Sequence, residues 1–126
     1  MTTTRLSPSA RIYRLKVCLL SHLGIWRGIE VPGDYTLRRL HFVIQDAMGW
    51  GNHHPHEFTV KRVRYTEPCD ELADFFAAGE LRSEYEVKLA DVARRKGARF
   101  SYLYDFGDMW RHEVLVEAIH PPEPGV

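Results

Sequence analysis

Residues Ser101–Val116, SYLYDFGDMWRHEVLV, give the clearest indication of the fold. It contains an Asp-Phe-Gly-Asp turn with alternating side chains before and after it, which predicts two antiparallel strands, Arg99–Asp105 and Met109–Ile119. Gly107 can supply the positive φ angle that such hairpin loops require. Polar and aromatic groups crowd this turn, so the hairpin is the first place to look for a functional site.

The two strands of this hairpin each have a distinct inner face. On the first strand the aromatic side chains alternate onto one side: Phe100, Tyr102, Tyr104 and Phe106. On the second strand Trp110, His112, Val114 and Val116 share a side, while the glutamates at 113 and 117 take the other. A strand keeps its apolar set on the core side, so His112 is expected to face the core with the tryptophan.

The first half of the chain predicts a hairpin followed by one long helix. Residues Ala10–Leu20 and Ile25–Val31 alternate as paired strands. Thr36 is a suitable N-cap for a helix over Leu37–Met48, and Gly49 is placed to end it. The apolar face of this helix is Leu37, Leu40, His41, Ile44 and Met48, with Gln45 assigned to the polar side.

The second half predicts shorter elements. A strand is expected over His56–Val63, a short helix over Asp70–Ala78, a short strand over Val87–Leu89 and another short helix over Asp91–Lys96. The fold class is therefore α+β: an antiparallel or mixed sheet of about five or six strands, with the main helix (about 36–48) packed on it and short helices in the 70–96 region. We expect a single domain over 11–119 and a flexible tail over 120–126.

Composition excludes several classes of protein. The chain has 126 residues and 44% hydrophobic residues, enough for one domain with a real core. Lys+Arg and Asp+Glu are both 17, which argues against a dedicated nucleic-acid binder. The two cysteines form no zinc spacing, and no apolar run has the length of a signal or a membrane span. A cytoplasmic protein without a membrane partner is predicted, and its oligomeric state stays open.

A set of polar and aromatic residues could line a groove near the hairpin turn. The candidates are His41, Trp50, His54, His56, Tyr104, Asp105, Asp108, Trp110 and His112. Alternation places His54 and His56 two residues apart on one strand face, a spacing that lets imidazoles converge. A structural network or ligand groove is the favoured interpretation, because aspartates at turns commonly bond backbone N–H groups.

Two catalytic alternatives remain for the same residues. A metal set would use His54, His56, Asp105, Asp108 and His112, although Pro55 weakens the two-histidine pair by removing one strand N–H. An acid–base pair is the other. No nucleophile motif, phosphate-binding loop or dinucleotide fingerprint is present, so no cofactor is favoured.

Two basic runs could contact nucleic acid. The first run consists of Lys61, Arg62 and Arg64. The second run, within Arg94–Arg99, consists of Arg94, Arg95, Lys96 and Arg99. The zero net charge favours a solvated face for both.

Four motifs resemble the plasmid pRiA4b ORF-3-like family, which also carries an insertion-element passenger label, TnpR. They are I-W-R-x-I-E-V-P at Ile25–Pro32, T-L-x-x-L-H-x-x-I-Q-x-A-M-G-W at Thr36–Trp50, H-x-H-E-F at His54–Phe58 and Y-D-F-G-D-x-W-x-H at Tyr104–His112. The resemblance covers about residues 11–119 and implies a compact bacterial or archaeal α+β domain with no assigned activity.

The chain departs from the family pattern at two positions. Gly28 stands where the family often has a second arginine, and Pro55 separates the two histidines. The label suggests recombination, but no recombinase pattern with a serine or tyrosine nucleophile and its arginines is found. The resulting expectation is a non-enzymatic binding or accessory domain linked to mobile elements, with partner unknown.

Overall fold

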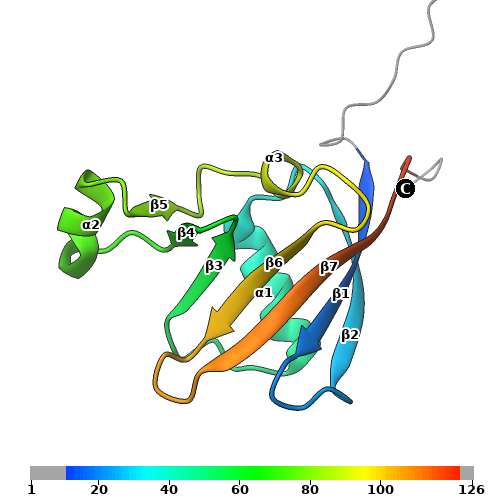
Figure 1. Ribbon diagram of the computed structural model, residues 1–126, viewed down its shortest axis with the longest axis horizontal. Coiled ribbons are helices and arrows are strands. Elements are labelled where there is room, and N and C mark those ends of the chain that lie inside the picture. The colour runs from blue at the N-terminus through cyan, green and yellow to red at the C-terminus, as the bar shows by residue number, and fades with distance from the viewer. Residues whose placement is uncertain (1–10, 123–126) are drawn as a thin grey trace, which may run out of the picture.

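The computed structural model describes residues 11–122 and contains a sheet of seven strands with helices packed beside it (Figure 1). The predicted tail at 120–126 lies partly outside the described residues, since only its first three positions are described and His120 ends the last strand. Along the chain the elements are β1 (Ile12–Leu19), β2 (Trp26–Pro32), α1 (Leu37–Met48), β3 (His56–Val60), β4 (Val63–Thr66), the 3-10 helix η2 (Asp70–Leu72), α2 (Ala73–Ala77), β5 (Leu81–Ser83), α3 (Leu89–Val92), β6 (Arg99–Tyr104) and β7 (Trp110–His120).

The strands form one mixed sheet in the order β2-β1-β7-β6-β3-β4-β5. Every neighbouring pair is antiparallel except β4 and β5, which are parallel. The predicted α+β class is confirmed, with seven strands in place of five or six. Strand β5, which the sequence did not predict, extends the sheet at one end. Helix α2 lies beside it, as Figure 1 shows on the left.

Helix α1 has the predicted bounds, and both of its ends have the predicted chemistry. The backbone N–H of Arg39 donates to Oγ1 of Thr36 over 3.2 Å, and Gly49 ends the helix with a φ angle of 75°. The expectation for Gln45 was wrong, because this side chain is buried. It lies four residues after His41, and side chains at that spacing occupy the same helix face.

The predicted strand over 56–63 is in fact a hairpin. Val60 pairs with Val63, so Lys61 and Arg62 form a two-residue turn between β3 and β4. Their φ angles are 47° and 71°. Two-residue hairpin turns with positive φ normally use asparagine and glycine, so a lysine and an arginine carry no signal for a turn at these positions.

The segment over 70–96 differs from its prediction in two places. The helix predicted over 70–78 is present as η2 followed by α2. The strand predicted over 87–89 is wrong, since only Lys88 forms an isolated bridge, to Thr36. The helix predicted over 91–96 is wrong for most of its length, since α3 spans Leu89–Val92 and residues 93–96 are not helical. The helix begins before Asp91 because the Asp91 carboxylate accepts the Lys88 N–H over 3.0 Å from the third helical position and does not act as the N-cap.

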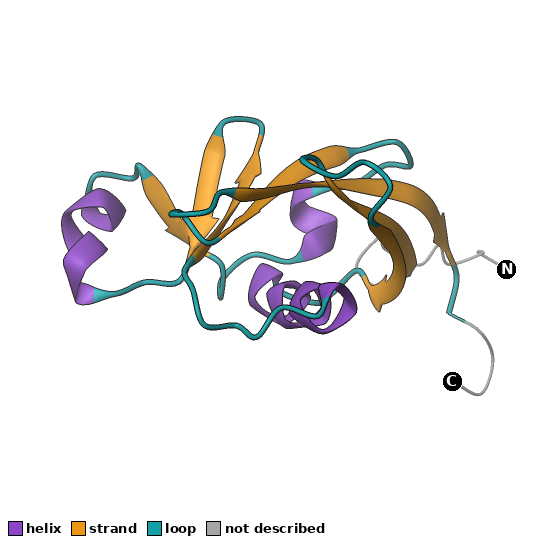
Figure 2. Cartoon of the chain, turned by 90° about the horizontal axis from the view of Figure 1, so that it is seen from below, coloured by secondary structure: helices purple, strands orange, loops and turns teal. Residues whose placement is uncertain are grey.

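The core lies on one side of the sheet, where α1 crosses it (Figure 2). Leu40 and Ile44 of α1 and Leu89 of α3 are buried there with Tyr13 and Tyr102 from the strands. The other face carries ion pairs between neighbouring strands: Arg14 with Glu117, Arg64 with Glu57 and Arg99 with Glu113. Helices long and apolar enough to cross a membrane are absent from residues 11–122.

Candidate functional site

The turn of the final hairpin is held by the Asp105 carboxylate. Its Oδ1 accepts the N–H groups of Gly107 (3.0 Å) and Asp108 (3.2 Å). Positive φ angles occur at Asp105 (63°) and Met109 (59°), so the prediction that Gly107 supplies this conformation was wrong. Aspartate tolerates the left-handed region because its short side chain bonds the nearby backbone.

The inner face of this hairpin is largely as expected. Tyr102, Tyr104 and His112 are buried, and Trp110 is partly buried. Phe106 departs from the prediction, since it lies in the turn and is 45% exposed. The turn interrupts the strand alternation, so its side chain no longer follows the face of Tyr102 and Tyr104.

His112 is locked in one neutral tautomer by its two partners. The indole N–H of Trp50 donates to its Nε2 over 3.2 Å, and an indole nitrogen can only donate. Nδ1 therefore carries the proton and donates to the carbonyl oxygen of Tyr102 over 3.1 Å. Burial lowers the pKa of His112, which keeps the ring neutral. Trp50 also stacks on Trp110, with ring centroids 5.5 Å apart.

His41 belongs to a second buried chain of hydrogen bonds. Its Nε2–H donates to Oδ1 of Asn52 (2.7 Å), and its Nδ1 accepts the hydroxyl of Tyr102 (2.6 Å). The amide of Gln45 donates to the same hydroxyl oxygen and its Oε1 accepts the Asn52 N–H. Burial, and then the nearby imidazole of His56, lower the pKa of His41 to about 4. His41 is thus neutral with both nitrogens satisfied.

His56 lies beside His41 and forms a hydrogen bond with a buried carboxylate, that of Glu84. Its ring stacks on that of His41, with centroids 3.5 Å apart and planes 11° apart. Its Nε2 donates to Oε1 of Glu84 over 2.5 Å. Oε2 of Glu84 accepts a hydrogen bond from Nη1 of Arg38 at 3.2 Å, and that same nitrogen reaches Glu67 at 3.1 Å. We refer to His56, Glu84 and Arg38 as the buried ion array.

Glu84 reaches this position from a connection that the sequence assigned to the surface. It follows β5, where its N–H donates to the carbonyl of Thr66 and its own carbonyl accepts the Arg38 N–H. Its side chain is fully buried. Local sequence held no signal for this, because the segment has the pattern of a cluster of solvated acids. A buried carboxylate needs partners, and the partners are 28 and 46 residues away in the chain.

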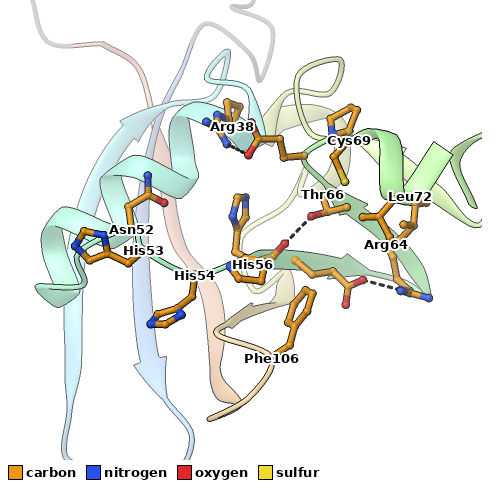
Figure 3. A pocket seen from close by; sticks show the side chains of 15 residues that line it. Arg38, Asn52, His53, His54, His56, Arg64, Thr66, Cys69, Leu72 and Phe106 are labelled. Carbon is orange, nitrogen blue, oxygen red and sulfur yellow. Dashed lines mark hydrogen bonds and ion pairs between the residues drawn. The ribbon is translucent and has the colours of Figure 1, made fainter.

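A hollow of about 550 Å³ opens beside the buried ion array. Figure 3 shows His56 in the middle of its lining, with Asn52, His53 and His54 on one side and Thr66, Cys69 and Leu72 on the other. The remaining lining residues are Arg38, Pro55, Glu57, Arg64, Glu67, Pro68, Leu81 and Phe106. The helix, the β3–β4 hairpin, the segment before η2 and the final hairpin turn therefore all border one space.

The two strand histidines do not share a face. His56 is buried, whereas the side chain of His54 is 52% exposed, with its Nε2 3.6 Å from Oδ2 of Asp105 and its ring edge-on to Tyr104. The chain is not yet in strand conformation at His54, because β3 begins at His56. Extending the alternation across Pro55 was therefore wrong.

The candidate metal ligands fall into separate places. His54 lies with Asp105, His56 with Glu84, and His112 with Trp50, while Asp108 is exposed in the turn. Across residues 11–122 no three histidine, cysteine, aspartate or glutamate side chains converge as a metal site would need. The residues that sequence reasoning missed are those that complete the polar chains: Arg38, Gln45, Asn52, Glu67, Glu84 and the hydroxyl of Tyr102.

Comparison with known proteins identifies the family. The pattern of the plasmid pRiA4b ORF-3-like protein family matches residues 11–126. The chain belongs to this family. An uncharacterized protein of Sinorhizobium fredii, y4hQ, is 39% identical over 115 residues, covering 89% of this chain and 56% of that protein.

A crystal structure shares the family fold. It is of a protein of unknown function from Methanosarcina mazei Go1, with 34% identity and a TM-score of 0.78 over 92% of this chain and 64% of that one. The chain therefore spans a little over half to about two thirds of the relatives that it matches. Neither relative carries an assigned activity in its name.

Proposed function

We propose that this pRiA4b ORF-3-like chain is a non-enzymatic binding or accessory domain, and that the hollow beside His56 is its recognition site. The volume, about 550 Å³, lies within the range of about 300–1,000 Å³ that small-molecule sites occupy. The family takes its description from a plasmid reading frame, and in this proposal the ligand or partner belongs to a mobile-element function. The observation that carries the proposal is that His56 bonds the buried carboxylate of Glu84 and also lines this open space.

The charges around the hollow favour a neutral ligand. Arg38 is already paired with Glu84 and Glu67, and Arg64 with Glu57 at 2.7 Å. A charged ligand would have to displace one of these internal partners, which costs the energy of the existing contact. Hydrogen bonding remains available, because the imidazole nitrogen Nδ1 of His56 has no partner among the described residues.

Apolar contact is available as well. Leu72, Leu81 and Phe106 line the same space, and Phe106 is 45% exposed. A small ligand with one hydrogen-bond donor for His56 and an apolar part would satisfy both kinds of surface. This matches the usual make-up of ligand sites, in which a few polar groups orient a mostly apolar molecule.

The test uses a library of neutral, hydrogen-bonding fragments observed by protein NMR. Cys69 is exposed and lines the hollow, so Cys69→Trp fills the space without touching the core. Cys69→Ser is the matched control. We expect fragments to shift signals of His56 and Thr66 in the native protein and in Cys69→Ser, and to lose this effect in Cys69→Trp. Fragments that bind equally to both variants would overturn the proposal.

A second function, acid–base catalysis, is favoured by one specific observation. The Glu84 carboxylate holds the proton of His56 on Nε2, which leaves Nδ1 without a proton on a side chain that lines the hollow. A carboxylate that orients the imidazole of a general base is the arrangement found in catalytic triads. In this account His56 would accept a proton from a bound substrate and Glu84 would be a positioning residue.

Hydrolysis of p-nitrophenyl acetate tests this second function. Correctly placed general bases raise reaction rates by about 10²–10⁴-fold. The His56→Gln variant should therefore hydrolyse the ester at least about 10²-fold more slowly than the native protein. His53→Gln is the control, since His53 is an exposed histidine lining the same hollow. Equal rates in the two variants would attribute the hydrolysis to surface imidazoles and remove the catalytic interpretation.

A further inference from the structure

The fold brings the two basic runs of the sequence to one end of the sheet. Strand β3 runs antiparallel to β6, with Thr59 opposite Ser101. The turn that follows β3 therefore lies beside the residues that precede β6, as Figure 1 shows for the upper edge of the sheet. Lys61 of the first run consequently comes next to Arg99 of the second, although many residues separate them in the sequence.

These cations line a second hollow, of about 610 Å³, distinct from the one beside His56. The basic side chains around it are Lys61, Arg94, Arg95, Lys96 and Arg99, and among the described residues Asp91 is the only acidic one in its lining. We call this space the basic hollow. In a chain whose formal charges cancel, this is a strong local concentration of positive charge.

Most of these cations have no acidic partner within the part of the chain that the structure describes. Arg99 pairs with Glu113 at 2.8 Å, and the Asp91 carboxylate accepts the backbone N–H of Lys88. For the four others no carboxylate lies within ion-pair distance among residues 11–122: Lys61, Arg94, Arg95 and Lys96. Elsewhere the protein pairs arginine with glutamate across neighbouring strands, so such an array of cations around a concave surface favours an external anion.

The turn that delivers Lys61 is conformationally strained. Both Lys61 and Arg62 have positive φ angles, which cost about 1–2 kcal/mol for a residue with a Cβ atom. Asparagine and glycine fit such a turn without this cost. The chain instead retains two basic residues there, and strain of this kind is typical of functional positions.

We propose that the basic hollow binds the phosphate backbone of double-stranded nucleic acid. Several cations from two chain segments can each neutralise one phosphate, and this neutralisation supplies most of the affinity in such binding. Among the described residues no aromatic side chain lines the hollow, so the stacking platform that single strands use is missing here. Its apolar lining (Val60, Val92 and Ala98) is buried or partly buried, so these groups do not project as membrane insertion would need.

The test is fluorescence anisotropy with a duplex of about 20 base pairs over a range of salt concentrations. Four phosphate contacts, at about −0.9 each, predict a slope of about −3 to −4 for log affinity against log salt. Arg94→Glu/Lys96→Glu should reduce that slope by about two and weaken binding by at least tenfold at low salt. Both positions are exposed, and circular dichroism with a thermal melt verifies that the variant is folded.

The matched control is Arg27→Glu/Arg82→Glu, which changes the net charge by the same amount at exposed positions outside the basic hollow. This control should retain native affinity and slope. Equal weakening by both variants, or a salt-independent native affinity, would overturn the proposal. So would tighter binding to a single strand of the same length, or to vesicles of anionic phospholipid. If the charge-reversed variant unfolds, Arg94→Gln/Lys96→Gln should still lower the slope by about two.

Discussion

The ring of His41 lies stacked on the ring of His56, yet only His56 is bonded to a carboxylate. His41 uses both nitrogens on neutral partners, Asn52 and Tyr102. Two imidazoles 3.5 Å apart cannot both carry charge without repulsion, so this pair depends on one ring staying neutral. The stability of the site therefore depends on pH.

Acidification is expected to destabilise the protein through His41. Its pKa is about 4 in the folded protein against 6.5 unperturbed, so between these values the unfolded state binds the additional proton. The contribution of neutral His41 to the free energy of unfolding is complete above pH 6.5 and is lost as the pH falls towards 4. A difference of this size corresponds to about 3 kcal/mol. Urea unfolding across this pH range measures it.

His41→Gln is the control for this prediction, because glutamine stays neutral at every pH used. This variant should be less stable at neutral pH but should show a flatter dependence of unfolding free energy on pH. An unchanged slope would mean that other groups cause the pH dependence.

Glu84→Gln should be strongly destabilising. The substitution leaves Arg38 and the His56 N–H without the carboxylate that both contact in the interior. Removing one member of a buried ion pair costs about 3–5 kcal/mol. Chemical denaturation at neutral pH gives the value. Glu80→Gln, an exposed position without an ion pair among the described residues, should change stability by less than about 0.5 kcal/mol.

Trp50→Phe should release His112 from its fixed tautomer. The phenyl ring retains most of the apolar contact but removes the N–H that Nε2 accepts. Leaving a buried acceptor unpaired costs about 1–3 kcal/mol. In the native protein, ¹⁵N chemical shifts of the His112 ring should show the proton on Nδ1. A native spectrum with the proton on Nε2 would contradict the assigned hydrogen bonds.

Replacing Lys61-Arg62 by Asn-Gly should stabilise the protein. Both positions have positive φ angles, and the replacement removes a cost of about 1–2 kcal/mol for each strained residue. Thermal and urea unfolding measure the gain. The same variant should bind duplex DNA more weakly than the native chain, since Lys61 lines the basic hollow. A variant that is no more stable would show that the turn carries no strain.

The sequence was sufficient where structure depends on neighbours in the chain. The bounds of α1 follow from Thr36, Gly49 and the helical spacing of Leu37, Leu40 and Ile44. The final hairpin follows from the alternation on either side of its turn. In both places the local pattern and the tertiary packing favour the same conformation.

The sequence was insufficient where a side chain is satisfied by distant partners. Glu84 sits among acids that have the pattern of a surface segment, and only the folded chain brings His56 and Arg38 to it. Gln45 is polar but bonds Tyr102 inside the core. The Lys61-Arg62 turn contains none of the residues that mark turns. These features depend on contacts that no local pattern encodes.

A crystallographic screen with neutral fragments soaked into the native protein tests directly whether the hollow beside His56 binds a ligand. If the hollow beside His56 is the recognition site, several fragments will occupy it, each within hydrogen-bond distance of Nδ1 of His56, with the contact between His56 and Glu84 intact. Fragments found only at other surfaces, or a hollow that stays empty at millimolar concentrations of every fragment, would contradict the claim.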